Sequence, residues 1–164
     1  MEKFMVPAVT ALISMEVEGD KFLLIQERWK NNVLEDGLLE IPGGKIREFE
    51  NIFDALRREV SEETGYKVTY IYGEEKSIIT KLNNYEVINY ECFYSSQNLG
   101  KNYPIMTNFF LCEVEGNRLE ESDESKNINW MSLRKLKEII NSNPEKFYPM
   151  HIEAIRKYIN IYYK

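Results

Sequence analysis

Three glutamates within five residues are the strongest candidates for chemistry in this chain of 164 residues. They are Glu59, Glu62 and Glu63, in the run REVSEE that begins at Arg58. In a helix, residues three and four positions apart lie on one face, so these carboxylates are expected to be neighbours. A hard divalent cation relieves their mutual repulsion, and Mg²⁺ prefers oxygen ligands together with waters and substrate phosphates.

The helix that must position these acids is predicted from an apolar stripe and a glycine stop. The stripe consists of Ile52, Phe53, Leu56 and Val60, and Gly65 can take the left-handed conformation that ends a helix. At ~100° per residue, Glu63 falls inside the apolar arc and Glu59 falls at its edge. A solvated acidic face is the simpler alternative. It does not explain an acid in the buried arc, because a buried acid is costly unless something pairs with it.

The segment from Gly44 to Tyr66 resembles the signature box of the Nudix hydrolase family. That box is Gly, five residues, Glu, seven residues, Arg-Glu, an apolar residue, any residue, Glu-Glu, any residue, Gly and an apolar residue. The matching positions are Gly44, Glu50, Arg58, Glu59, Val60, Glu62, Glu63 and Gly65. Tyr66 stands where the family usually has an aliphatic residue, which is a departure in packing and leaves the chemistry intact.

The resemblance implies hydrolysis of a nucleoside diphosphate linked to a further group, by attack of water on a phosphorus of the pyrophosphate. It implies that Glu59, Glu62 and Glu63 bind Mg²⁺, for which Mn²⁺ can substitute, together with the backbone carbonyl of Gly43. The general base is either Glu59 or an acid of the loop 115–127. The loop candidates are Glu120, Glu121, Asp123 and Glu124.

Three basic residues complete the expected site. Arg58 is placed among the catalytic residues, as a brace that pairs with Glu50 and holds the loop to the helix. Lys45, which follows the glycines, and Arg28, at the start of a polar loop, are candidate substrate-binding residues. A solvated lysine and an ordinary surface loop are the alternative interpretations of these two.

The formal net charge of −6 argues against a protein that holds long nucleic acid on a broad basic surface. It does not argue against a small nucleotide, because a bound metal ion reverses the local field. A lone histidine, His151, nearly excludes a zinc site or a Ser-His-Asp triad, and we expect it to be structural or exposed. Cys92 and Cys112 are expected to be small buried hydrophobes.

The order of elements predicts one α/β domain, residues 1–164, with a mixed sheet covered on both faces. Strands are predicted at 6–17, 21–27, 38–41, 67–72, 74–82, 85–94, 107–114 and 128–131, and helices at the box, 132–141 and 150–162. The pattern alone supports only α/β or α+β. The resemblance implies the Nudix α/β/α sandwich, with the loop-helix-loop of the box on one face.

The apolar start, 5–15, lacks a signal-peptide cleavage site and is followed by acids, so a first core strand explains it better. No apolar run is long enough to span a bilayer. We therefore expect a cytoplasmic protein whose partner is a small nucleotide, with no membrane partner. A homodimer remains open.

Substrate choice lies outside the box. Family members that cleave ADP-ribose often carry a proline past the box, and 80–82 contains none. This favours a (deoxy)nucleoside triphosphate over ADP-ribose or a nucleotide sugar. A regulatory nucleotide-binding domain without turnover is the alternative of another class, but such members usually lose box acids. The aromatic residues that could stack on a base are Tyr85, Phe93, Tyr94 and Phe109, although core packing is their commoner role.

Overall fold

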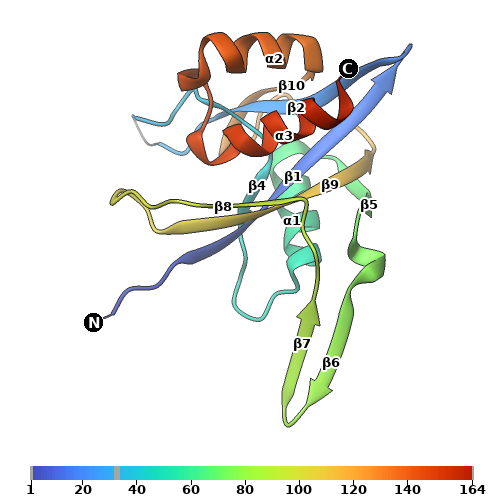
Figure 1. Ribbon diagram of the computed structural model, residues 1–164, viewed down its shortest axis with the longest axis vertical. Helices are drawn as coiled ribbons and strands as arrows, with labels where there is room; N and C mark the ends of the chain where they lie inside the picture. The colour runs from blue at the N-terminus through green and yellow to red at the C-terminus, as the bar shows by residue number, and fades with distance from the viewer. Residues whose placement is uncertain (1, 32–33, 164) are drawn as a thin grey trace.

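The computed structural model describes residues 2–31 and 34–163 and contains a large mixed sheet (Figure 1). Its strand order is β10-β2-β1-β9-β5, that is Ser125–Ser132, Asp20–Arg28, Val6–Val17, Ile105–Glu115 and Lys67–Ile71. Three short strands join it: β3 (Leu39–Glu40) pairs with β2, β4 (Gly43–Lys45) with β1, and β8 (Tyr94–Gln97) with β9. β1 and β9 run parallel, while the other paired strands are antiparallel, so the predicted mixed sheet is confirmed.

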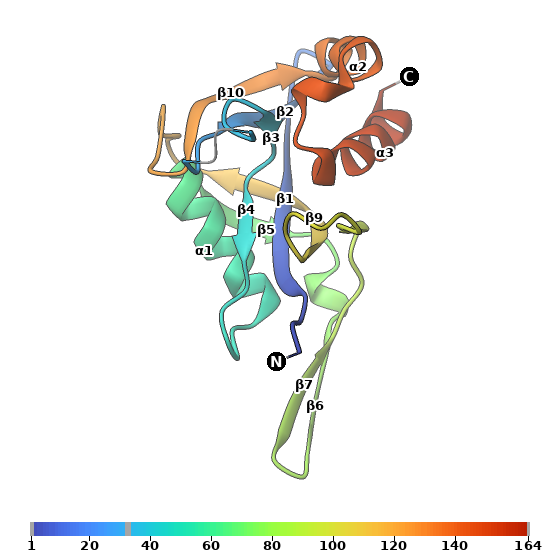
Figure 2. The same ribbon diagram turned by 90° about the vertical axis from the view of Figure 1, so that its left-hand side faces the viewer.

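Helices cover both faces of this sheet (Figure 2). α1 (Ile52–Thr64) packs on one face, and α2 (Leu133–Ser142) and α3 (Ile152–Tyr162) pack on the other. Side chains of a strand alternate between the faces, so Ala11 and Ile13 of β1 join the core under α1, whereas Leu12 joins the core under α2 and α3. The predicted α/β/α sandwich is confirmed. Among the residues that the structure describes, no helix is long and apolar enough to cross a membrane.

The ends of α1 are set by local chemistry. The side chain of Asn51 caps the helix by accepting a hydrogen bond from the backbone N–H of Phe53, at 2.9 Å. Gly65 ends it in the left-handed conformation, with a φ of 78°. The apolar stripe is buried on the sheet, and Glu63 is buried with it, at 3% exposure. The predicted helix, its glycine stop and the buried position of Glu63 are therefore confirmed.

β1 is long enough to hold two partners along one edge. Its first half pairs with β4, with Thr10 opposite Gly43, and its last residues pair with β2. The glycine segment is consequently pressed between β1 and α1. A Cβ added at Gly43 would lie 2.7 Å from Thr10 Cα and closer still to the carbonyl oxygen of Val9. This close approach requires glycine at position 43.

The predicted strands at 74–82 and 85–94 were partly wrong, whereas the strand predicted at 128–131 is confirmed as part of a longer one. Residues 74–76 form a 3₁₀ turn, because Gly73 has a φ of 94° and Arg57 of α1 pairs with Glu74. β6 (Ile78–Leu82) and β7 (Tyr85–Asn89) form a hairpin of their own, and the chain returns to the main sheet at β8, which begins at the last residue of the predicted strand 85–94. β10 begins at Ser125 and accommodates its extra residues with an irregularity between Lys126 and Asn129.

His151 is buried and structural. Its Nδ1 accepts a hydrogen bond from the backbone N–H of Ile41 at 3.2 Å, and its ring contacts those of Phe109 and Tyr148 edge-on. Burial lowers the pKa of His151 to about 3, and the positive charge of Arg28 adds to the effect. The neutral imidazole is therefore part of the folded structure.

We expect the His151→Gln variant to lose less free energy of unfolding than the wild type as the pH falls into the mildly acidic range. The unfolded chain protonates this residue near pH ~6.5, whereas the folded chain resists protonation until about pH 3. The free energy of unfolding consequently falls as the pH drops below ~6.5. Glutamine keeps an acceptor for the Ile41 N–H and does not titrate. Thermal melts of both proteins between pH 7 and pH 4 test this, and parallel curves would contradict it.

Candidate active site

Glu63 is held at the meeting point of α1, β2 and the glycine segment. Its Oε2 accepts hydrogen bonds from Gln26 Nε2 at 2.8 Å and from the backbone N–H of Gly43 at 3.0 Å. Its Oε1 faces Lys30 Nζ at 3.3 Å. Burial raises the pKa of Glu63 to about 7, although Lys30 opposes the shift. A carboxylate this costly to bury needs a cation beside it.

A second buried acid, Glu40, shares the same amide group. Gln26 Nε2 donates to Glu40 Oε1 at 3.2 Å, and Arg28 Nη1 donates to Glu40 Oε2 at 2.9 Å. Burial raises the pKa of Glu40, and Arg28 opposes that rise. Within the described residues, Gln26 Oε1 is buried without a partner. The amide nitrogen of Gln26 thus bridges two carboxylates, because its oxygen would be repelled by both.

Arg58 braces the loop that precedes α1. Its Nε and Nη2 donate to the two carboxylate oxygens of Glu50, at 2.7 and 2.8 Å, so the predicted pair is confirmed. Nη2 also donates to the carbonyl of Lys45 at 3.0 Å, and Nη1 donates to Glu59 Oε1 at 2.6 Å. The bidentate contact lowers the pKa of Glu50 to about 2. One guanidinium therefore fixes the loop and one box acid together.

The remaining box acids are more open than Glu63. The carboxylate of Glu59 lies against Gly44, where an added Cβ would be 2.7 Å from Glu59 Oε1. The side chain of Glu59 is 13% exposed, whereas that of Glu62 is 53% exposed. Glu62 is held loosely, by Arg58 at 3.2 Å and by Arg47 at 3.6 Å. The exposure of the three acids on this helix face thus increases from Glu63 to Glu59 to Glu62.

The donor set of this face suits a hard divalent cation. It offers carboxylate oxygens, one pair of which, from Glu59, fits against the backbone of Gly44 because that residue has no Cβ, and Mg²⁺ prefers oxygen ligands. Within the described residues, no three acids are already gathered as a ligand set. Lys30, Arg47 and Arg58 hold the carboxylates of the box instead. The residues would fit a metal ion if Lys30 turned aside from Glu63.

A family model described as the NUDIX domain matches residues 5–151. The chain belongs to the Nudix family. A curated 8-oxo-dGTP diphosphatase from Buchnera aphidicola subsp. Schizaphis graminum is 40% identical over 57 residues, which are 35% of this chain and 42% of that protein. The Nudix chain described here thus matches less than half of the length of that relative.

Solved Nudix structures share the fold. A MutT protein from Methanosarcina mazei Go1 has a TM-score of 0.61 at 22% identity, over 100% of this chain and 99% of that chain. The NUDIX domain of Shewanella oneidensis NrtR, complexed with ADP ribose, has a TM-score of 0.61 at 16% identity, over 84% of this chain and 79% of that chain. At these identities the likeness concerns the architecture.

The predicted substrate-binding residues of this Nudix chain differ in how free they are. Arg28 is mostly buried, paired with Glu35 at 3.0 Å as well as with Glu40, and its guanidinium lies over the ring of Tyr148. Lys45 is exposed, with its Nζ 5.4 Å from the centre of the Tyr103 ring. Lys45 is therefore the freer of the two to meet a phosphate.

One acid of the predicted loop reaches the box. Glu124 pairs with Lys30 at 2.5 Å, and Lys30 also pairs with Glu63, so the lysine links the loop to α1. Burial lowers the pKa of Lys30, but Glu63 and Glu124 together raise it above its ordinary value. The other three loop candidates, Glu120, Glu121 and Asp123, are exposed and form no ion pair with the box within the described part of the chain.

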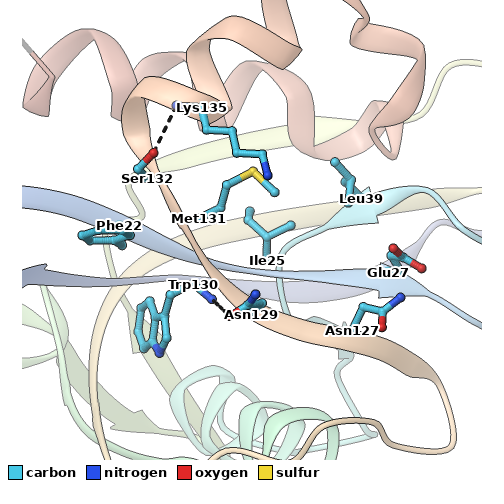
Figure 3. A pocket seen from close by; sticks show the side chains of 10 residues that line it. All are labelled: Phe22, Ile25, Glu27, Leu39, Asn127, Asn129, Trp130, Met131, Ser132 and Lys135. Carbon is cyan, nitrogen blue, oxygen red and sulfur yellow. Dashed lines mark hydrogen bonds between the residues drawn. The ribbon is translucent and has the colours of Figure 1, made fainter.

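The predicted stacking residues lie elsewhere. Phe109 is fully buried under α3, Tyr85 lies in β7, and Phe93 and Tyr94 flank Lys157 of α3. A hollow of about 410 Å³ also lies away from the box, between β2, β10 and the start of α2 (Figure 3). Its walls include Glu27 and Lys135, and no residue of the box lines it. The chemistry of the acids marks the site better than the shape of the surface does.

Gln26 and Glu40 are the site residues that sequence reasoning missed. Each is a polar residue inside an apolar strand run, FLLIQ and LLEI respectively. Such a residue is costly to bury alone, so its presence was the available signal for a buried polar network. Its partner could not be read from the sequence, because Gln26 and Glu63 are brought together by the fold.

Proposed function

We propose that this Nudix protein hydrolyses the pyrophosphate linkage of a nucleoside diphosphate derivative in a Mg²⁺-dependent reaction. Glu59, Glu62, Glu63 and the carbonyl of Gly43 would hold the ion, and Mn²⁺ would substitute. The observation that carries the proposal is the buried Glu63 carboxylate, on which β2, the glycine segment and the box helix converge. Because it is buried, this carboxylate is not an ordinary solvated surface charge, and its oxygens suit the binding of a cation.

The chain's own residues prepare the reaction. When bound, the ion would neutralise phosphate charge and lower the pKa of a bound water. Gln26 and the Gly43 N–H keep Glu63 in one orientation. Arg58 orients Glu59, which is our candidate for the group that accepts the proton of the attacking water. Lys45 is our candidate for contact with a phosphate, and Glu124 is the alternative base on the loop.

For the substrate we favour a (deoxy)nucleoside triphosphate. The similarity to an 8-oxo-dGTP diphosphatase and the absence of a proline at 80–82 support this choice. ADP-ribose or a nucleotide sugar is the second candidate, favoured by the likeness to a NUDIX domain complexed with ADP ribose. A binding domain without turnover is disfavoured, because every acid of the box is present and Arg58 makes its brace.

A nucleotide panel tests the proposal. The purified protein with Mg²⁺ should release phosphate, pyrophosphate or monophosphate from at least one substrate and should stop when a chelator is added. We expect a higher kcat/KM for a nucleoside triphosphate than for ADP-ribose. The opposite ranking would favour the second substrate candidate. The absence of turnover across the whole panel would support the binding domain.

A further inference from the structure

The hairpin of β6 and β7 stands apart from the main sheet. Its two strands pair with each other, from Ile78 opposite Asn89 to Leu82 opposite Tyr85, and with no other strand of the described chain, and the hairpin projects beyond the layers of the sandwich (Figure 1). Its tip is formed by Asn83 and Asn84, both with positive φ, as in the tight turns that suit hairpins. An isolated two-stranded hairpin is only marginally stable in water. This one therefore needs a surface to pack against.

The strand register divides the hairpin into two unlike faces. One face carries the cross-strand pairs Ile78–Asn89, Thr80–Val87 and Leu82–Tyr85, and we call it the uncharged face. The other face carries the ion pair of Lys81 and Glu86 at 3.0 Å, together with Ile79 and Ile88. Ile88 packs against the core under α1, so the charged face is the one tied to the protein.

The uncharged face is open to solvent. Its large side chains are exposed by 64% at Ile78, 68% at Leu82, 73% at Tyr85 and 43% at Val87. Together they present on the order of 500 Å² of surface, which is as large as the biggest apolar patch on a typical monomer. Two such faces in full contact would bury about 1,000 Å², which is the lower bound for a biological interface.

We propose that the uncharged face binds the same face of a second copy of this chain, across a two-fold axis. The chain carries a net charge of −6, so two copies repel each other wherever charged surfaces meet. A face without charges avoids this repulsion, and a two-fold contact requires a patch that complements itself. The pairing also covers the face of each hairpin that is exposed in the single chain.

A pair of adjacent substitutions tests the proposal. Ile78→Glu places a carboxylate on the uncharged face, whereas Ile79→Glu makes the same change one residue along, on the face of the ion pair. Sedimentation equilibrium across the micromolar range should show a dimer for the wild type and for Ile79→Glu. Ile78→Glu should raise the dimer Kd at least ~10²-fold, because the contact would bury an unpaired carboxylate on each copy.

Circular dichroism melts of the three proteins establish that each is folded. If Ile78→Glu fails to fold, Thr80→Glu on the same uncharged face replaces it. A wild type that is monomeric across the concentration range would overturn the proposal, as would a dimer that survives Ile78→Glu and Thr80→Glu. Equal weakening by Ile78→Glu and Ile79→Glu would overturn it too. Binding of the monomer to vesicles of neutral lipid would assign the face to a membrane instead.

Discussion

Glu63→Gln is expected to lower kcat at least ~10²-fold, since the variant loses a ligand of the ion that stabilises charge in the transition state. It should also lose most of the Mg²⁺-dependent rise in melting temperature, because a ligand stabilises a folded protein only to the extent that it binds. Steady-state rates on the best substrate and melts with and without Mg²⁺ measure both effects.

Without metal, the same variant should be at least as stable as the wild type at neutral to basic pH, although its activity falls. Burial raises the pKa of Glu63 to about 7, so the folded state favours the protonated carboxyl. The free energy of unfolding is therefore highest below the ordinary pKa of this residue and falls as the pH rises through about 7. Glutamine has nearly the same shape and no charge. The variant should therefore be as stable as the wild type or more stable at pH ~8, and this advantage should vanish at pH ~4.

Glu138→Gln is the matched control, because Glu138 is an exposed acid of α2 in the opposite layer. We expect it to change the free energy of unfolding by less than ~0.5 kcal/mol and to leave the rate unchanged. A Glu63→Gln protein with the rate and the metal response of the wild type would remove Glu63 from the site.

Gly43→Ala and Gly44→Ala should differ in what they damage. At position 43 the added methyl group meets backbone atoms of β1, which cannot move without separating β4 from β1. Overpacking of this kind costs ~1–3 kcal/mol, so the free energy of unfolding should fall by that amount or more. At position 44 the three atoms nearest to the added methyl group all belong to the carboxylate end of Glu59, which can swing away at the expense of its contact with Arg58.

Gly44→Ala should therefore remain folded while displacing Glu59. We expect a kcat at least ~10-fold lower with a nearly unchanged denaturation midpoint, because a small misplacement of a catalytic group is costly. The two variants serve as controls for each other, since each adds one methyl group to neighbouring residues. Urea denaturation and steady-state kinetics measure the contrast. Equal losses of stability in both would contradict our account of the glycine segment.

The features that sequence alone predicted are those fixed by local spacing. The box helix, its stop at Gly65 and the buried position of Glu63 follow from a period of 3.6 residues and a glycine. The pair of Glu50 and Arg58 connects a loop to the first turns of the helix that follows it, eight residues along the chain. Such contacts join residues that are close in the sequence, so they depend little on distant segments.

The features that sequence did not predict depend on how strands align. Gln26 reaches Glu63, 37 positions away, only because β2 and β4 flank the same long strand. The turn at 74–76 likewise depends on the ion pair between Glu74 and Arg57 of α1. The alternation of residues that predicts a strand gives no information about this contact. Tertiary contacts, which override local preference, therefore set both the network around Gln26 and the turn that replaces the start of the predicted strand 74–82.

Lys30 would make the binding of the proposed metal ion an exchange of one cation for another. The lysine forms ion pairs with Glu63 and with Glu124, so the free protein supplies its own monovalent competitor for the buried carboxylate. A divalent ion that binds Glu63 has to displace this ammonium group. The apparent Kd for the ion then equals the intrinsic Kd divided by the fraction of molecules in which Lys30 has swung away. If the proposed ion binds, its occupancy would thus depend on the conformational equilibrium of the Lys30 side chain as well as on the concentration of the ion.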